Sequence, residues 1–228
     1  MNSEYSKFYL SDKGIDILSY EAKIKDFRKK LGFLTEKYKD ESVLDIGCGV
    51  GYLVFFLKKQ GFKDVTAIDL DEKLIEIARS NVDVNFIRGD GMSYLMNNDR
   101  QYGVIFLWNV LEHIPKNETI DFLKIANRRL LQDGVVVIRT PNLTNIFSSG
   151  HFYSDFTHQT AFTEHSIRQA AESAGFSKVE FIEQFSVQSF TGKIKAIVNW
   201  LLHKSALWLR GGKKSRIFYR NLYVVFCK

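Results

Sequence analysis

The sequence contains a glycine-rich turn flanked by two carboxylates that are suited to binding a nucleoside. In the stretch Val43-Leu44-Asp45-Ile46-Gly47-Cys48-Gly49-Val50-Gly51, an apolar run leads into glycines that open a helical pattern. Glycine allows a tight turn there and lets a ligand approach the backbone, because it has no Cβ atom. Asp69 ends the next apolar run, where its carboxylate can accept hydrogen bonds from ribose hydroxyls.

The charge of this turn distinguishes between two kinds of nucleoside ligand. A pyrophosphate binds at an uncrowded helix N-terminus, and the Asp45 carboxylate at the start of the turn would repel it. The spacing Gly-x-Gly-x-Gly also departs from the Gly-x-Gly-x-x-Gly of dinucleotide-binding loops. A further carboxylate, Asp90 in the run Arg88-Gly89-Asp90-Gly91-Met92, can accept from an adenine amine. The turn therefore favours the cationic ligand S-adenosylmethionine over a nicotinamide or flavin dinucleotide.

Two histidines are candidates for proton transfer. His113 lies just beyond the fourth expected strand, and His158 lies in the run from Tyr153 to Thr163, between the fifth strand and the next helix. Histidine is the side chain whose ordinary pKa best suits proton exchange near neutral pH. We expect His158 to act as a general base oriented by Asp155, with His113 as a second polar contact. The alternative is that His158 only hydrogen-bonds the backbone of its own loop.

Alternating strand and helix patterns place all these residues in one α/β domain covering residues 1–228. Short apolar runs separated by amphipathic helical patterns predict a doubly wound, mostly parallel sheet, with ligands at the carboxyl ends of its strands. Residues 1–40 are expected to form a helical cap, with a helix from Tyr20 to Tyr38, and residues 141–163 the acceptor-side loop. The expected strands are Ser42 to Ile46, Val65 to Asp69, Val84 to Arg88, Tyr102 to Trp108, Val135 to Thr140, Lys178 to Phe185 and Asn221 to Cys227. The expected helices between them are Gly51 to Gln60, Asp71 to Ser80, Asn117 to Leu131 with Asn117 as its cap, and one capped by Thr163 that runs to Ala174.

The run Asn109-Val110-Leu111-Glu112-His113-Ile114 resembles the segment after the fourth strand of ubiquinone-pathway O-methyltransferases. With the turn Leu130-Leu131-Gln132-Asp133-Gly134-Val135, it gives residues 38–185 a resemblance to class I S-adenosylmethionine-dependent methyltransferases. The resemblance implies a seven-stranded sheet with an antiparallel last strand, and S-adenosylmethionine as cofactor. It also implies a cofactor site made of Asp45, Gly47, Cys48, Gly49, Asp69, Leu70, Asp90, Gly91 and Met92, with Asn109 beside the sulfonium.

The acceptor is suggested by a second resemblance. The pattern Asp-x-Thr-His-x-x-x-Phe-Thr, from Asp155 to Thr163, is similar to that of methyltransferases of bacterial surface-polysaccharide and glycolipid pathways. It favours a sugar or sugar-linked hydroxyl, with a quinone-type small molecule as the alternative. Nucleic acid is not expected as a partner, because no aromatic and basic platform lies near the pocket.

A metal-assisted mechanism is a further alternative. Glu112, His113 and His158 offer one carboxylate and two imidazoles, which are suitable metal ligands. Small-RNA 2′-O-methyltransferases and some ubiquinone-pathway enzymes resemble this set in using a Glu-x-x-Glu-His segment with a divalent metal. Because Asn109 replaces the first Glu of that segment, we expect a metal-free site.

The positive charge of the chain is concentrated at its C-terminal end. The net charge is +6, yet no acidic residue follows Glu183, whereas nine of the 32 Lys and Arg residues do. The region before Lys193 therefore has 23 basic and 26 acidic residues. Residues 190–214 are expected to form a basic amphipathic insertion, with an apolar stripe between Lys193 and Arg210. Such a helix suits either an anionic membrane surface, contacted through residues 193–216, or packing on the domain or a dimer partner.

The remaining composition suggests where the protein is found. The chain has two cysteines, too few for a disulfide framework, and no apolar run long enough to cross a membrane. We expect a cytoplasmic protein, in contact at most with the inner face of the membrane. A dinucleotide-dependent oxidoreductase is disfavoured by Asp45, whereas a non-catalytic S-adenosylmethionine-binding or scaffold protein stays possible.

Overall fold

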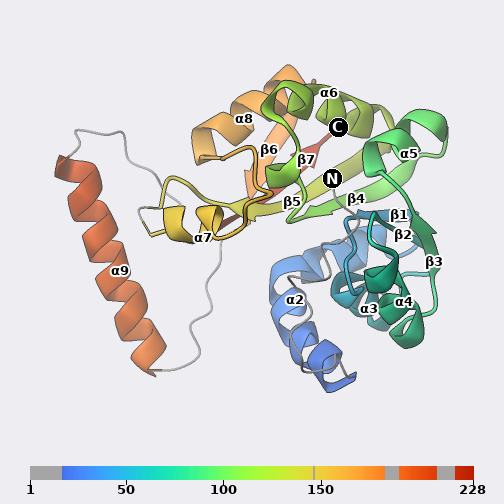
Figure 1. The fold of residues 1–228 in the computed structure, drawn as a ribbon, viewed down its shortest axis with the longest axis horizontal. Helices are drawn as coiled ribbons and strands as arrows, with labels where there is room; N and C mark the ends of the chain where they lie inside the picture. Colours follow the sequence, from blue (N-terminus) through green and yellow to red (C-terminus); the bar gives the residue numbers. More distant parts are fainter. Residues whose placement is uncertain (1–16, 146, 183–189, 210–218) are drawn as a thin grey trace.

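The computed structural model describes residues 17–145, 147–182, 190–209 and 219–228 and contains a seven-stranded sheet (Figure 1). The strand order is β3-β2-β1-β4-β5-β7-β6. All neighbouring strands are parallel except β7, which is antiparallel to both β5 and β6. The expected fold, including the antiparallel last strand, is confirmed. The strands are β1 (Val43–Ile46), β2 (Val65–Asp69), β3 (Asn85–Arg88), β4 (Tyr102–Trp108), β5 (Leu130–Pro141), β6 (Lys178–Phe181) and β7 (Asn221–Cys227).

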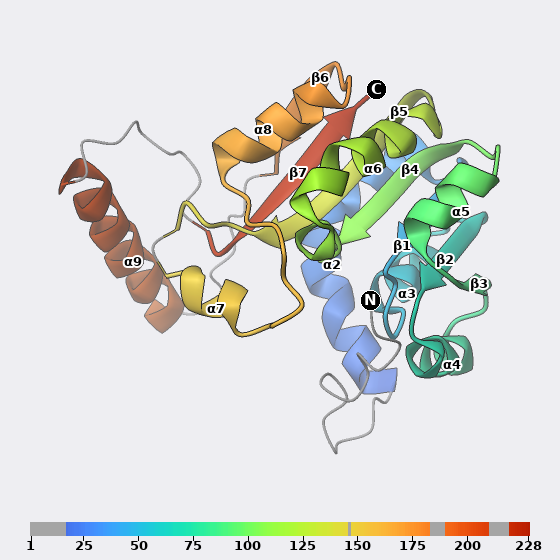
Figure 2. The ribbon, with the colours of Figure 1, turned by 45° about the horizontal axis from the view of Figure 1, so that its top comes forward.

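Helices cover both faces of this sheet (Figures 1 and 2). On one face, α2 (Ile17–Tyr38), α3 (Tyr52–Lys59) and α4 (Glu72–Asn81) pack on apolar residues of β1, β2 and β4. On the other face lie α5 (Gly91–Asn97), α6 (Lys116–Arg128) and α8 (Glu164–Ser173). The central strands are almost wholly buried, as expected for a parallel sheet covered on both sides. The strand order reverses between β1 and β4, and ligands of such sheets bind at this switch point.

Helix α2 contributes to the cap that the sequence predicts. It begins at Ile17, three residues before the expected Tyr20, and residues 1–16 of the expected cap lie outside the described part of the chain. Its buried face includes Tyr20, Phe27 and Leu31. The Tyr20 hydroxyl donates a hydrogen bond of 2.6 Å to the backbone carbonyl of Val50. This bond connects the cap directly to the glycine turn.

Several short elements differ from the expectation. The structure adds α5, the 3-10 helix η1 (Leu111–His113) and α7 (Ser149–Tyr153), each too short for a periodic apolar pattern. Helix α6 begins at Lys116 with Pro115 in the cap position, so the expected cap at Asn117 is wrong. The Thr163 cap of α8 is confirmed, and its hydroxyl accepts from the backbone of Ser166.

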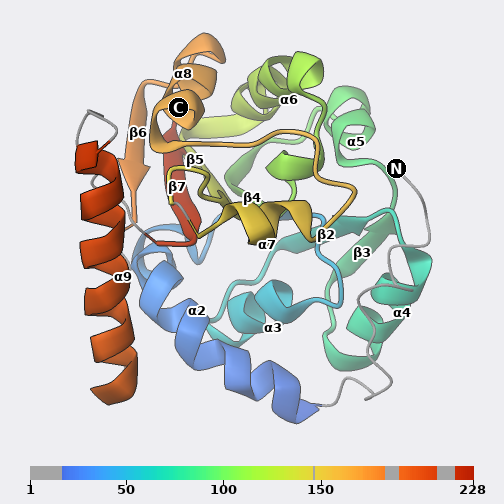
Figure 3. The ribbon, with the colours of Figure 1, turned by 60° about the vertical axis from the view of Figure 1, so that its left-hand side comes forward.

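The C-terminal insertion contains α9 (Phe190–Leu209), which lies on the outer side of the molecule (Figure 3). Residues 210–214 of the expected insertion, and residues 183–185 of the strand expected to reach Phe185, lie outside the described residues. Among the described helices, none combines the length and apolar character needed to cross a membrane.

Candidate active site

The glycine turn after β1 leaves open space for a ligand. Gly47 and Gly49 have positive φ angles of 71° and 54°, which favour glycine. A Cβ atom on Gly47 would lie 2.4 Å from Cγ2 of Val110, so packing requires glycine there. A Cβ atom on Gly49 would meet no atom within 4 Å, apart from its chain neighbours. The turn is therefore packed on one side and open at Gly49.

Asp69 at the end of β2 fixes the shape of this turn. Its Oδ2 atom accepts a hydrogen bond of 2.7 Å from the amide of Gly49, and its Oδ1 atom accepts one of 2.9 Å from the amide of Asp71. Burial raises the pKa of Asp69, and the two backbone amides oppose that rise. Each carboxylate oxygen has a second lone pair, so Asp69 can also accept from ribose hydroxyls.

Asp45 is a buried carboxylate whose two oxygens have no hydrogen-bond partner among the described residues. It is 1% exposed, and burial together with the charge of Asp69 raises its pKa well above the ordinary value. An unpaired buried carboxylate is costly and is stabilised by a cation. The methionine part of S-adenosylmethionine carries an ammonium and a sulfonium, so this pair of carboxylates fits that cofactor and does not fit a diphosphate.

The other expected cofactor residues surround the same strand ends, and several also have structural roles. Asp90 caps α5, where its Oδ1 atom accepts from the amide of Ser93 at 2.8 Å. A Cβ atom on Gly91 would lie 2.3 Å from Cγ2 of Ile46. The Cys48 thiol is buried, which raises its pKa. Leu70 and Met92 are half-buried.

Asn109, expected beside the sulfonium, is held by Arg139. Its φ of 61° is the one positive value among the described non-glycine residues. The backbone amide of Asn109 donates a hydrogen bond of 2.8 Å to the backbone carbonyl of Arg139. The side-chain Oδ1 atom of Asn109 accepts a hydrogen bond from the Arg139 guanidinium. Arg139 Nε in turn donates to the Tyr223 hydroxyl at 3.0 Å. These contacts could not be predicted from residue spacing, because Arg139 and Tyr223 belong to strands that pair only in the folded sheet.

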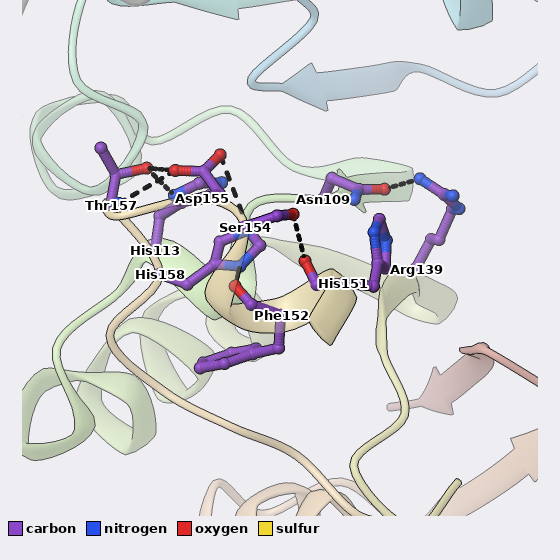
Figure 4. A network of polar contacts seen from close by, with 9 residues as sticks. All are labelled: Asn109, His113, Arg139, His151, Phe152, Ser154, Asp155, Thr157 and His158. Atoms are coloured by element: carbon purple, nitrogen blue, oxygen red, sulfur yellow. Dashed lines mark hydrogen bonds and ion pairs between the residues drawn. The ribbon is translucent and has the colours of Figure 1, made fainter. Parts of the chain in front are cut away.

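The two expected histidines lie against each other, with ring centroids 4.7 Å apart (Figure 4). The amides of Gln159 and Thr160 donate to the carbonyl of Glu112, at 2.8 and 3.0 Å. Gln159 Nε2 donates to the carbonyl of His113 at 2.8 Å. These bonds join the segment after β4 to the loop after α7, so residues far apart in sequence form one site.

Hydrogen bonds at Nδ1 determine which nitrogen of each neutral ring carries the proton. His158 Nδ1 lies 2.6 Å from the carbonyl of Phe152, which can only accept, so Nδ1 carries the proton. The Thr157 hydroxyl donates to Asp155 Oδ1 at 2.6 Å and lies 2.9 Å from His113 Nδ1, so that nitrogen donates to Thr157. In their neutral forms both rings therefore carry a lone pair on Nε2.

Asp155 lies in the site, where its Oδ1 atom accepts from the backbone amide and the hydroxyl of Thr157. Its Oδ2 atom is 3.9 Å from His158 Nε2, too far for a hydrogen bond but close enough to stabilise a protonated ring. The backbone carbonyl of Phe152 sets the orientation of His158 instead. The expected alternative, a bond from His158 to its own loop, is thus present on Nδ1 and leaves Nε2 free to act. The contacts of Thr157 and of the Phe152 carbonyl with the two histidines were not predicted from the sequence, because loop conformation determines the positions of these groups.

Glu112 completes a cluster that could bind a cation. It is buried, neither oxygen has a hydrogen-bond partner among the described residues, and burial raises its pKa to about 7. Burial and the charge of His158 lower the pKa of His113. Ligand atoms of Glu112, His113 and His158 lie within 4.8 Å of one another, the one such cluster in the described chain. Asn109 points to Arg139 and away from the imidazoles, so it adds no ligand (Figure 4).

Comparisons with known proteins agree with this arrangement. Residues 18–180 match the model of a methyltransferase domain family. A ubiquinone biosynthesis O-methyltransferase of Rickettsia bellii is 32% identical over 127 residues, covering 50% of this chain and 51% of the relative. A ribosomal protein L11 methyltransferase of Ruminiclostridium cellulolyticum is 48% identical over 54 residues, covering 23% of this chain and 17% of the relative. The chain thus spans about half the length, or less, of these relatives.

Solved structures show the same fold. A SAM-dependent methyltransferase from Archaeoglobus fulgidus superposes with a TM-score of 0.69 at 21% identity, covering 98% of this chain and 97% of that one. Magnesium protoporphyrin IX methyltransferase from Synechocystis with bound SAH has a TM-score of 0.60 at 15% identity, covering 98% of this chain and 92% of that one. Because the family model spans most of the chain, the protein belongs to the methyltransferase domain family.

Proposed function

We propose that the protein is an S-adenosylmethionine-dependent O-methyltransferase that deprotonates a hydroxyl acceptor at the Nε2 atom of His158, with His113 as a second polar contact. The observation that carries this proposal is the pairing of two sites at the carboxyl edge of the sheet. One is the unpartnered Asp45 carboxylate beside the open glycine turn. The other is the pair of imidazoles whose Nδ1 atoms are both occupied. Cation binding and proton removal are the two tasks of methyl transfer to oxygen.

Each task is assigned to residues of this chain. Asp45 faces the ammonium of the cofactor, and Asp69 accepts from its ribose while holding Gly49 in place. S-adenosylmethionine supplies the methyl group, which is bonded to its sulfonium sulfur. When the acceptor oxygen bonds to the methyl carbon, the carbon–sulfur bond breaks and the sulfur leaves as a neutral sulfide. His158 Nε2 takes the acceptor proton, and Asp155 stabilises the resulting imidazolium. A general base of this kind contributes about 10²–10⁴-fold to the rate.

The acceptor class is a finer proposal with two forms. A sugar or sugar-linked hydroxyl in cell-surface polysaccharide or glycolipid synthesis is supported by the motif from Asp155 to Thr163. A phenolic hydroxyl of a quinone-type molecule is supported by the name of the Rickettsia relative.

A metal-assisted form of the reaction is the second candidate, and the cluster of Glu112, His113 and His158 favours it. The buried, unpartnered Glu112 carboxylate fits a divalent ion, whereas Arg139 close to Glu112 opposes one. A metal held there would act as a Lewis acid on the acceptor hydroxyl. Turnover that survives EDTA dialysis would exclude this form; turnover lost in EDTA and restored by a divalent metal would establish it.

The experiment that tests the proposed function measures methyl transfer from radiolabelled S-adenosylmethionine. The acceptors are catechols, free sugars, sugar nucleotides and lipid-linked glycans, with a thiol and an amine as non-hydroxyl controls. We expect label in a base-stable ether of one hydroxyl class. Label only in the thiol or amine would contradict O-methylation. Binding of S-adenosylhomocysteine without transfer to any acceptor would instead support a non-catalytic binding protein.

A further inference from the structure

Helix α9 presents a face of large apolar residues to solvent. Ile194, Ile197, Val198, Leu201 and Trp208 recur at helical spacing, which places them on one side of the helix. All five are exposed, and Trp208 is 81% exposed. We call these five residues the α9 apolar face. A soluble domain normally buries such a face, so its exposure indicates an interaction surface.

A second exposed apolar group lies in the acceptor-side loop. Tyr153 and Phe156 are 78% and 102% exposed, although Phe152 and His158 in the same segment are turned inward toward the candidate site. Helices α7 and α9 both lie toward the left of Figures 1 and 2. The segment that carries the aromatic pair and helix α9 therefore lie toward one end of the molecule.

The charge on this part of the chain is of one sign. No acidic residue follows Glu183, and the basic residues after it number nine. Lys204 is exposed on α9 itself, with its ammonium 4.6 Å from the Trp200 ring centroid. An apolar face with tryptophans and flanking cations matches the composition of helices that lie in a membrane interface. The basic residues are Lys193, Lys195, Lys204, Arg210, Lys213, Lys214, Arg216, Arg220 and Lys228.

We propose that the α9 apolar face, together with Tyr153 and Phe156, docks on an anionic lipid bilayer surface. The unbroken positive charge favours an anionic surface over a second copy of this chain, which would carry the same charge. Lys193, Lys195 and Lys204 interrupt the apolar sequence of α9, as in helices that lie in the headgroup region. Tyr and Trp side chains are well suited to that depth, because each has an apolar ring and a polar group. The proposal concerns binding alone and does not depend on the acceptor.

The test is co-sedimentation of the purified full chain with sucrose-loaded vesicles. One set contains equal parts of phosphatidylglycerol and phosphatidylcholine, and the other contains phosphatidylcholine alone. We expect the protein to sediment with the anionic vesicles at low salt, to be released at high salt, and to bind the neutral vesicles weakly. Binding to neither set, or equal binding to both sets at all salt concentrations, would overturn the proposal.

Matched variants locate the surface. The triple variant Ile197→Ser, Leu201→Ser and Trp208→Ser should lower the partition coefficient about tenfold or more, because it removes most of the inserted apolar area. The double variant Tyr153→Ser and Phe156→Ser should lower it by a smaller factor. Met96→Ser is the control, since Met96 is an exposed apolar residue on α5, away from this surface. Unchanged binding of the triple variant, in a protein that retains its melting temperature, would contradict the proposal. A second result would also contradict the proposal: the protein does not bind vesicles, light scattering detects a dimer, and the same three substitutions dissociate that dimer.

Discussion

Asp69 Oδ2 accepts a hydrogen bond of 2.7 Å from the amide of Gly49, which ties the end of β2 to the turn after β1. The bond fixes a left-handed glycine beside open space, so the turn has its shape before a ligand arrives. Such preorganisation reduces the free energy lost on ordering the site during binding. The same carboxylate is thus both a structural acceptor and a candidate ribose acceptor.

Replacing Asp69 should affect stability and binding together. Asp69→Ala removes the acceptor of two backbone amides, and we expect a loss of about 2–3 kcal/mol in the free energy of unfolding. Binding of S-adenosylhomocysteine should weaken at least tenfold, about 1.4 kcal/mol. Denaturant unfolding and calorimetric titration measure the two quantities. A variant with normal stability and normal affinity would show that the turn holds its shape without this carboxylate.

The two glycines of the turn should respond differently to alanine. Gly47→Ala forces a Cβ atom to 2.4 Å from Val110 and strains a left-handed residue, so we expect a loss of about 2 kcal/mol or more in unfolding free energy. Gly49→Ala meets open space, so it should lose only about 1–2 kcal/mol for its backbone conformation. Its methyl group should nevertheless lower S-adenosylhomocysteine affinity. Thermal melts and titrations of the pair test this, and unimpaired affinity in Gly49→Ala would place the ligand elsewhere.

The charge of Asp45 makes both stability and cofactor affinity depend on pH. Because burial raises the pKa of Asp45 in the folded state, its contribution to stability is fully present below the unfolded pKa and is lost as pH rises through the raised value. Asp45→Asn cannot ionise, so its melting temperature should exceed that of the wild type at pH 8 and approach it at pH 5. Melting curves across this range provide the measurement.

Cofactor affinity should change with pH in the opposite sense. The ligand ammonium pairs with ionised Asp45, so binding to the wild type should release a proton and strengthen as pH rises. Asp45→Asn should bind more weakly, and the part of the pH dependence that is due to Asp45 should disappear. Titrations in buffers of different ionisation enthalpy detect the released proton. Equal affinity of variant and wild type at pH 8 would contradict the role of Asp45.

Much of this fold could be predicted because its signals are local and periodic. Buried strands such as β4 are unbroken apolar runs in the sequence. In the turn from Gly47 to Gly51, the glycines themselves indicate a tight backbone conformation. Helix α5 escaped prediction because only Gly91 and Leu95 of its seven residues are buried, which is too few for a period. The beginning of β5 was missed because Leu131 to Gly134 resembles a turn; the strand begins at Leu130, and its pairing with β4 is irregular before Val135.

The candidate site was predictable in its residue types and less so in its connections. His113 and His158 stand out by chemistry and by position after strands, yet their partners are a carbonyl and a threonine placed by loop conformation. The bond between Asn109 and Arg139 joins the ends of β4 and β5 and has no local pattern. Contacts between residues far apart in the sequence depend on how the elements pack, and the spacing of residues along the chain does not predict them.

The most direct test of the proposed acceptor chemistry is the methyl-transfer rate of His158→Ala beside its affinity for S-adenosylhomocysteine. The substitution removes Nε2 as a base but leaves Asp45, Asp69 and the glycine turn unchanged. We expect turnover to fall about 10²–10⁴-fold while affinity changes less than about threefold. Asp155→Asn keeps the shape of the side chain but removes the negative charge that stabilises the imidazolium. Its methyl-transfer rate should lie between the rates of the wild type and of His158→Ala. Turnover retained by His158→Ala would contradict the proposed role of this histidine.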